Sequence, residues 1–208
     1  MPKVTEAYRE ARRRQILDAA VSCFVRGGIH ATTMADVIAE SGLSSGAIYD
    51  YYGSKQELAL AAVRREGAGR AAEIEAAGHE APIPPSAVLR ILDDAFVRRP
   101  NAPKIILQLW SEAATQPDFA EIANSAFDEL RRAFRGPLLA WARSEHGLDD
   151  AAAAAWADRV APTMLALTQG LVLQKTVVPG FERERYFAGV DALFQLQEQP
   201  VAAPGAIA

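Results

Sequence analysis

The chain has 208 residues, half of them hydrophobic, and a formal net charge of −4. This length is sufficient for one substantial core or two small ones. A single cysteine, Cys23, excludes a disulfide framework and favours a reducing compartment. The charged N-terminus lacks the apolar segment of a secretory signal, and the most apolar tract, residues 160–174, is too short and too polar to span a bilayer. We therefore expect a soluble cytoplasmic protein without a membrane partner.

Charge is unevenly distributed along the chain. Residues 1–70 hold ten Lys or Arg and eight Asp or Glu, a net of +2, whereas residues 71–208 hold twelve and eighteen, a net of −6. A mildly basic end joined to an acidic body is a weak indication of a segment that faces nucleic acid. Ordinary charge scatter explains the same numbers equally well.

Helical spacing of apolar residues dominates the chain, and strand alternation is almost absent. A first helix is expected from about residue 12 to Gly27. Thr33 then opens a short second helix, in which Asp36 takes the acidic position of a capping box, and Gly42 suits a left-handed helix end. These signals predict two helices joined by a glycine turn.

The next two helices are marked by serines. Ser44 or Ser45 is expected to cap a third helix that runs to about Tyr51. Ser54 and Glu57 form a second capping box, which opens a long fourth helix to about residue 77. This helix is the element expected to connect the two halves of the chain.

The rest of the chain reads as helices separated by proline and glycine. Residues 78–85 (GHEAPIPP) form the clearest linker, and Gly136-Pro137 predicts a kink or a split. The expected helices cover residues 86–99, 104–115, 119–146, 149–176 and 182–197. The fold class is therefore all-α, with about nine helices. The expected segments are a helix–turn–helix domain (1–53), a connecting helix (54–77), a second domain (78–198) and a disordered tail (199–208).

The third helix has two different faces. At about 100° per residue, Ile48 and Tyr52 fall on one side, with Ala47 and Tyr51 flanking them. The opposite side carries Ser45, Gly46, Tyr49 and Asp50. A helix–turn–helix protein needs a second helix that is held by one face and offers the other to the major groove. Three tyrosines in a small helical core are the alternative interpretation.

The segment TTMADVIAESGLSSGAIYDYYGSKQEL at residues 32–58 resembles the DNA-binding signature of the TetR family of bacterial transcriptional regulators. The resemblance covers residues 9–60; beyond residue 80 it rests on length and helix count. The residues that match the family pattern are Gly42, Ile48, Tyr49, Tyr52, Ser54, Lys55 and Leu58. Two departures stand out: Tyr52 replaces the usual Phe, and Asp50 replaces His, Tyr or Trp. Because an acid repels phosphate, Asp50 would have to face a base edge or point away.

The resemblance implies a homodimer that binds a double-stranded DNA operator. We expect no enzymatic activity and no cofactor. The residues expected at the DNA are Thr33, Met34, Ser44, Ser45, Gly46, Ala47, Tyr49, Asp50, Tyr51 and Lys55. The last two long helices would form a four-helix bundle across the dimer axis. The residues expected there are Leu165, Ala166, Gly170, Leu171, Phe187, Val190 and Phe194. Intramolecular core packing is the alternative for this stripe.

The family also implies a small effector bound by the larger helical domain. Candidates for its site are Phe96, Gln108, Trp110, Phe127, Phe134, Trp141, Met164 and Gln169, although core packing is the better interpretation of each one singly. The three histidines have no metal-ligand spacing, and no nucleophile–base motif is present. Two hypotheses remain: a repressor released by a small, largely apolar molecule, or a helical binding or catalytic protein with a vestigial helix–turn–helix.

Overall fold

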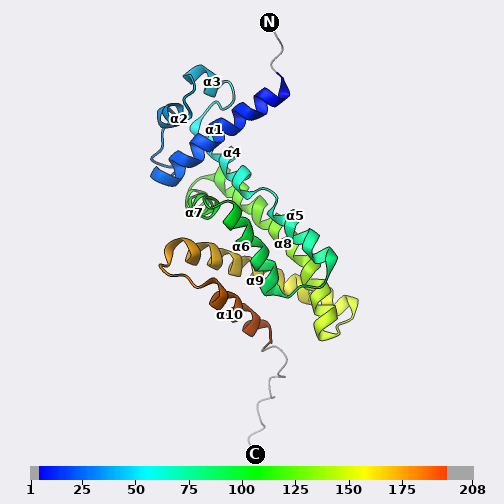
Figure 1. Ribbon diagram of the computed structural model, residues 1–208. Coiled ribbons are helices and arrows are strands. Elements are labelled where there is room, and N and C mark those ends of the chain that lie inside the picture. Colours follow the sequence, from blue (N-terminus) through cyan, green and yellow to red (C-terminus); the bar gives the residue numbers. More distant parts are fainter. Residues whose placement is uncertain (1–4, 196–208) are drawn as a thin grey trace, which may run out of the picture. The chain divides into compact units, whose positions relative to one another are not determined.

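The computed structural model describes residues 5–195, without the side chain of Glu80. Within that range the chain forms ten α-helices and no β-strand, which confirms the all-α fold class (Figure 1). The predicted end of the last helix and the predicted tail lie outside the described residues. The helices are α1 (Glu6–Gly27), α2 (Met34–Ser41), α3 (Ser45–Tyr49), α4 (Lys55–Gly67), α5 (Arg70–Glu80), α6 (Pro85–Arg98), α7 (Ala102–Ala113), α8 (Pro117–His146), α9 (Asp150–Val177) and α10 (Arg183–Gln195). None of these ten helices could cross a membrane.

The chain divides into two compact units. Among the described residues, the N-terminal unit comprises residues 5–70 and 95–129, and the C-terminal unit comprises residues 71–94 and 130–195. The N-terminal unit therefore contains α7 and the first part of α8 in addition to the first four helices. Both α6 and α8 contribute residues to each unit.

The core of the N-terminal unit is built around α1. Ile16 and Phe24 are fully buried, and Ile48 of α3, Leu58 of α4 and Ile105 of α7 join the same apolar cluster. The capping box of α2 and its glycine end form as predicted. Gly42, which follows the last residue of α2, has φ +67°, a left-handed conformation that favours glycine. The short helices are thus placed by caps at their ends and one apolar face each.

The expected fourth helix over residues 54–77 is wrong as a single element. α4 ends at Gly67 and α5 begins at Arg70, with Gly69 at φ +87° between them. Two arginines stabilise the break from outside the helix: Arg70 donates to the carbonyl oxygen of Glu66 at 2.9 Å, and Arg99 donates to that of Arg65. Since α6 and α8 also run through both units, the expectation that the fourth helix alone connects the halves is wrong too.

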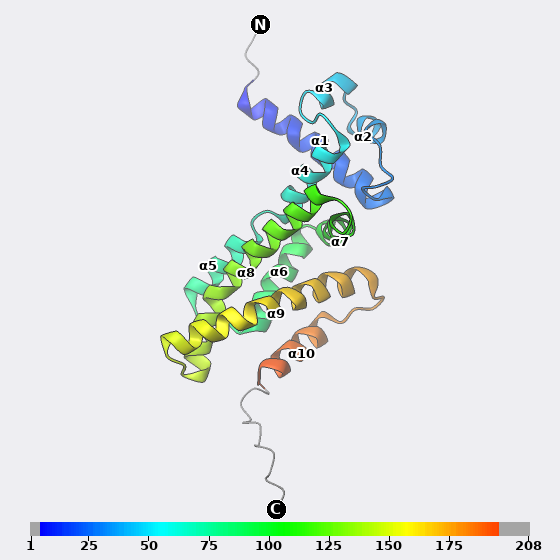
Figure 2. The same ribbon diagram turned by 180° about the vertical axis from the view of Figure 1, so that it is seen from behind.

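The C-terminal unit has a core of its own, in which Phe134, Met164 and Phe187 are fully buried. α5 and α8 lie side by side in both views (Figures 1 and 2), and α10 is tied to α9 by the Tyr186 hydroxyl, which donates to the carbonyl oxygen of Leu167. α8 is one unbroken helix through Pro137, so of the predicted kink or split, the split does not occur. Gly78 of α5 makes room for the proline ring.

Candidate nucleic-acid interface and effector site

The third helix is fixed at its start and on one face. The Ser44 hydroxyl accepts a hydrogen bond from the backbone N–H of Ala47 at 3.2 Å and so caps the helix. Ile48 is fully buried and Tyr52 is 8% exposed, whereas Tyr49 is 49% exposed and Tyr51 is half-buried. The division of the three tyrosines expected from helical spacing is confirmed. One face of α3 is therefore core and the other is open.

The open face of α3 is small and polar. Ser45 and Gly46 are exposed at its start, with Ala47 half-buried beside them. Asp50 is exposed at the C-cap, and its carboxylate has no hydrogen-bond or ion-pair partner among the described residues. A carboxylate without a partner can accept from a base amino group, but it repels a phosphate.

The start of α2 is occupied by its own capping box. The backbone N–H and the hydroxyl of Thr33 both donate to Asp36 Oδ2, at 2.8 and 2.7 Å, and the Asp36 N–H donates back to the hydroxyl at 3.2 Å. The two hydrogen bonds that the carboxylate accepts from Thr33, first that of the backbone N–H, lower the pKa of the Asp36 carboxyl. Thr33 is exposed, and Met34 is half-buried against the core. Of these two, Thr33 has the more open surface.

Lys55 opens α4 and bonds back to the loop before α2. Its Nζ donates to the carbonyl oxygen of His30 at 2.7 Å. Ser54 caps the helix by accepting from the Glu57 N–H at 3.1 Å. The return bond of the predicted capping box is displaced by one residue, since Glu57 Oε2 accepts from the Gly53 N–H at 2.8 Å. Lys55 retains two further ammonium donors for a phosphate.

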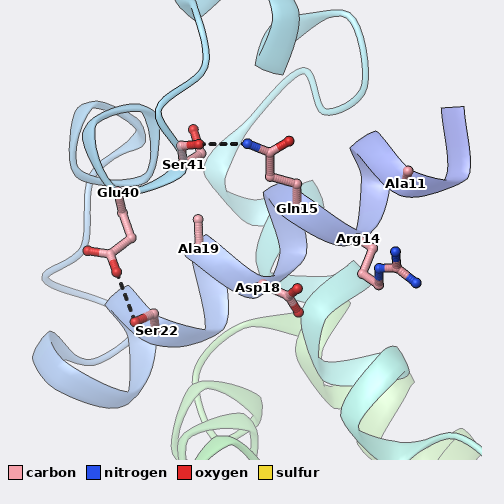
Figure 3. A pocket seen from close by; sticks show the side chains of 8 residues that line it. All are labelled: Ala11, Arg14, Gln15, Asp18, Ala19, Ser22, Glu40 and Ser41. Carbon is pink, nitrogen blue, oxygen red and sulfur yellow. Dashed lines mark hydrogen bonds between the residues drawn. The ribbon is translucent and has the colours of Figure 1, made fainter. Parts of the chain in front are cut away.

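α1 and α2 are joined along a polar groove of about 470 Å³ (Figure 3). Gln15 donates to the Ser41 carbonyl oxygen at 2.9 Å, and the Ser22 hydroxyl donates to Glu40 at 3.1 Å. Arg26 forms an ion pair with Glu40 at 2.9 Å, and its hydrogen bond lowers the pKa of that carboxyl. These ties were missed in the sequence, because polar residues on a helix surface give no periodic signal for their partners. These contacts fix the position of α2 relative to α1.

The sequence-predicted effector residues do not form one group. Phe96, Gln108, Trp110 and Phe127 belong to the N-terminal unit, and Phe134, Trp141, Met164 and Gln169 belong to the C-terminal unit. Phe96, Phe134 and Met164 are core residues with 2% exposure or less. The rings of Trp110 and Phe127 pack together with centroids 6.1 Å apart, and both amide atoms of Gln108 bond to backbone groups.

Trp141 is different, because it lines a hollow of about 400 Å³ within the C-terminal unit. Its ring lies near those of His146, Trp156 and Phe194, with centroid distances of 4.7, 5.6 and 6.3 Å. The hollow is lined by Pro82, Pro84, Pro85, Trp141, Ser144, Glu145, His146, Asp191, Phe194 and Gln195. The carboxylates of Glu145 and Asp191 have no ion-pair partner among the described residues. No cluster of metal-ligating side chains occurs in that range.

The predicted dimer stripe is corrected at four positions. Leu171 and Phe187 are fully buried within the single chain, and Val190 and Phe194 are 2% and 6% exposed. Their side chains pack in the core of the single chain, and only Phe194 also reaches the lining of the hollow, so the four expose too little surface to form an interface with a second copy. Leu165 and Gly170 are half-buried, and Ala166 is exposed. The large apolar side chains that are exposed on α9, on α10 and in the turn between them are instead Leu173, Val177, Val178 and Leu193.

Comparison with known proteins shows to which family this chain belongs. The family described as bacterial regulatory proteins, tetR family, matches residues 16–62, and the family described as BetI-type transcriptional repressor, C-terminal, matches residues 84–196. The chain belongs to the TetR family. It is a DNA-binding transcriptional regulator with a BetI-type C-terminal segment.

Curated relatives agree with this assignment. The transcriptional repressor Rv1474c of Mycobacterium tuberculosis is 33% identical over 142 residues, which cover 64% of this chain and 71% of that protein. The regulator BetI of Rhizobium meliloti is 25% identical over 85% of this chain and 83% of its own. The regulator YfiR of Bacillus subtilis is 46% identical over 57 residues, which cover 27% of this chain and 28% of YfiR.

Solved structures share the fold. A transcriptional regulator from Pseudomonas aeruginosa PAO1 superposes with a TM-score of 0.75 at 21% identity, over 94% of this chain and 93% of its own. A regulator from Saccharomonospora viridis, solved in complex with choline, superposes with a TM-score of 0.67 at 24% identity, over 90% and 96% of the two chains. At these identities the likeness shows that this TetR-family chain has the same architecture.

Proposed function

We propose that this regulator is a cytoplasmic repressor that binds an inverted-repeat operator as a homodimer and leaves it when a small organic molecule binds. The observation that carries the proposal is the exposed face of α3, from Ser45 to Asp50, which Ile48 and Tyr52 hold in place from behind. Small residues at the start of this face let the backbone approach the major groove. Tyr49 and Lys55 are placed to contact phosphates, and Ser45, Gly46 and Asp50 to face bases.

Selection from a random pool of duplexes tests this proposal. We expect the protein to enrich an inverted repeat whose half-sites lie about one helical turn, 34–36 Å, or a multiple of it apart. The affinity for the duplex should fall steeply as the salt concentration rises, because phosphate contacts release counterions. A protein that enriches no sequence would instead support the alternative of a helical binding or catalytic protein with a vestigial helix–turn–helix.

A second copy of the chain supplies the symmetry of such an operator. The exposed apolar residues of α9 and α10, Leu173, Val177 and Leu193, are 50%, 62% and 56% exposed. Covering such residues removes apolar surface from water, which favours association. The exposed Ala166 would allow close helix approach, while Leu165 and Gly170 contribute at its edge.

The aromatic hollow suggests the chemistry of the effector. Trp141 and Phe194 offer ring surfaces, and Glu145 and Asp191 offer negative charge without a partner. Rings attract cations through their quadrupole, and carboxylates add Coulomb attraction. The effector that this lining favours is a small organic cation with an apolar periphery. The choline complex of the Saccharomonospora viridis regulator supports this class.

Choline and its neutral carbon isostere, dimethylbutanol, form a matched pair of probes. We expect choline, but not dimethylbutanol, to change the tryptophan fluorescence and to weaken binding to the selected duplex. Asp191→Asn should weaken the choline response without changing duplex binding in its absence. Choline that binds at this hollow but leaves duplex affinity the same would refute the coupling. If neither probe binds, the proposed effector class is wrong.

A further inference from the structure

Gln108 joins segments that belong to different family regions. It lies on α7, inside the BetI-type segment, and both of its hydrogen-bond partners lie inside the region that matches the tetR family. Its Nε2 donates to the carbonyl oxygen of Phe24 at 2.9 Å, and its Oε1 accepts from the backbone N–H of Ile29 at 3.0 Å. Both bonds are partly buried. The amide of Gln108 thus bonds to two backbone groups, those of Phe24 and Ile29, with four residues between them.

The two partners lie on either side of the turn that ends α1. Phe24 is in the last turn of α1, and Gly28, at φ +86°, redirects the chain immediately before Ile29. The Ile29 side chain is 4% exposed, and the Thr32 hydroxyl donates to the Gly28 carbonyl oxygen at 2.7 Å. Gln108 therefore fixes the path of the chain from α1 toward α2. An amide is suited to this position, since a carboxylate lacks the donor and a thioether lacks both groups.

The position of the α1 end, which Gln108 fixes, affects the position of α2 and α3, the helices proposed to read DNA. α1 is tied to α2 by the bonds from Gln15 to Ser41 and from Ser22 to Glu40 (Figure 3). α2 in turn packs against α3. A displacement of the α1 end relative to α7 would move these helices together. Base contacts require correct placement within a fraction of an ångström, whereas phosphate contacts tolerate more error.

We propose that Gln108 is a positioning residue for operator reading: it clamps the turn between α1 and α2 onto α7 and so sets the placement of α3 for base contacts. Through this clamp the BetI-type segment takes part in sequence recognition although Gln108 does not touch DNA. The inference rests on the DNA-reading role of α3. A wild-type protein that enriches a duplex establishes that role independently, so the two ideas fail separately.

The test compares sequence-specific with non-specific binding. Gln108→Met keeps the length of the side chain and removes both hydrogen bonds. We expect its affinity for the duplex that the wild type enriches to fall about tenfold or more, whereas its affinity for random duplex and its salt slope stay the same. Amide exchange at Ile29 should become faster, because its N–H loses its partner.

Two further variants separate positioning from simple loss of stability. Ile105→Val, in the fully buried part of the same helix, should lower the melting temperature without changing the ratio of specific to random affinity. Gln108→Glu keeps the acceptor for Ile29 and should lose less discrimination than Gln108→Met; it also serves if Gln108→Met does not fold. If both Gln108 variants fold and keep the wild-type affinity ratio, Gln108 only stabilises the fold and the proposal is overturned.

Discussion

Gly78 of α5 lies directly against Pro137 of α8. A Cβ atom built on Gly78 would be 2.5 Å from Cγ of the proline ring, and 3.1 and 3.2 Å from its Cδ and Cβ. Real Cβ atoms essentially never approach a neighbour as closely as the first of these distances. Because Gly78 has no side chain, α5 can lie directly against the proline ring of α8.

Gly78→Ala should therefore destabilise the protein. Overpacking a tight contact costs about 1–3 kcal/mol of unfolding free energy, since the proline ring cannot rotate away. Thermal unfolding followed by circular dichroism measures the loss. Gly189→Ala, at an exposed glycine inside α10, is the control: its Cβ would meet nothing within 4 Å and no proline follows it, so removing a helix-interior glycine should raise stability by about 0.5–1 kcal/mol. Equal effects of both changes would contradict this account of the contact.

Stability should also depend on the protonation of Asp36. The backbone N–H and the hydroxyl of Thr33 bond to its carboxylate and lower its pKa in the folded protein. This contribution is fully present above the pKa of the unfolded chain, about 3.9, and is lost as the pH falls through the lower folded value. The melting temperatures of wild type and Asp36→Asn should differ most near neutral pH and converge in acid. A difference in melting temperature that stays the same from neutral pH into acid would contradict this role of the Asp36 carboxylate.

Local signals in the sequence predicted the helix ends well. The caps at Thr33, Ser44 and Ser54 and the left-handed Gly42 depend on neighbouring residues alone, and all four occur in the structure. The burial of Tyr52 and the exposure of Tyr49 followed from the helical period. For these features the physical cause lies within a few residues of the chain.

Long-range partners could not be predicted in the same way. The prediction of one long fourth helix did not allow for the break at Gly67 and Gly69. Arg99 stabilises this break by donating to the carbonyl oxygen of Arg65, which lies 34 residues away in the sequence. Gln108 was expected at an effector, but its partners lie 79 and 84 residues away. The apolar period of α10 identified a buried stripe without showing whether its own chain or a partner covers it.

The proposed dimer surface predicts different behaviour for two neighbouring residues of α10. Leu193 is 56% exposed and Phe194 is 6% exposed. Leu193→Asp should give folded monomers, because it places a charge on an exposed apolar face that a second copy would cover. Phe194→Asp should unfold the C-terminal unit, since a charge buried without a partner is strongly destabilising. Sedimentation velocity with circular dichroism distinguishes these outcomes. A Leu193→Asp protein that remains dimeric would place the interface elsewhere.

Lys55 provides the most direct test of the DNA face. Its Nζ is held 2.7 Å from the His30 carbonyl oxygen, which directs the ammonium while leaving two donors for a phosphate. Lys55→Ala should weaken binding nearly equally for the selected duplex and for random duplex. It should also lower the slope of log affinity against log salt by about one, because one phosphate contact is lost. Lys55→Arg should keep the slope, and Lys104→Ala, an exposed lysine on α7, should leave both quantities at wild-type values. If affinity and slope survive Lys55→Ala unchanged, the start of α4 does not face the DNA backbone.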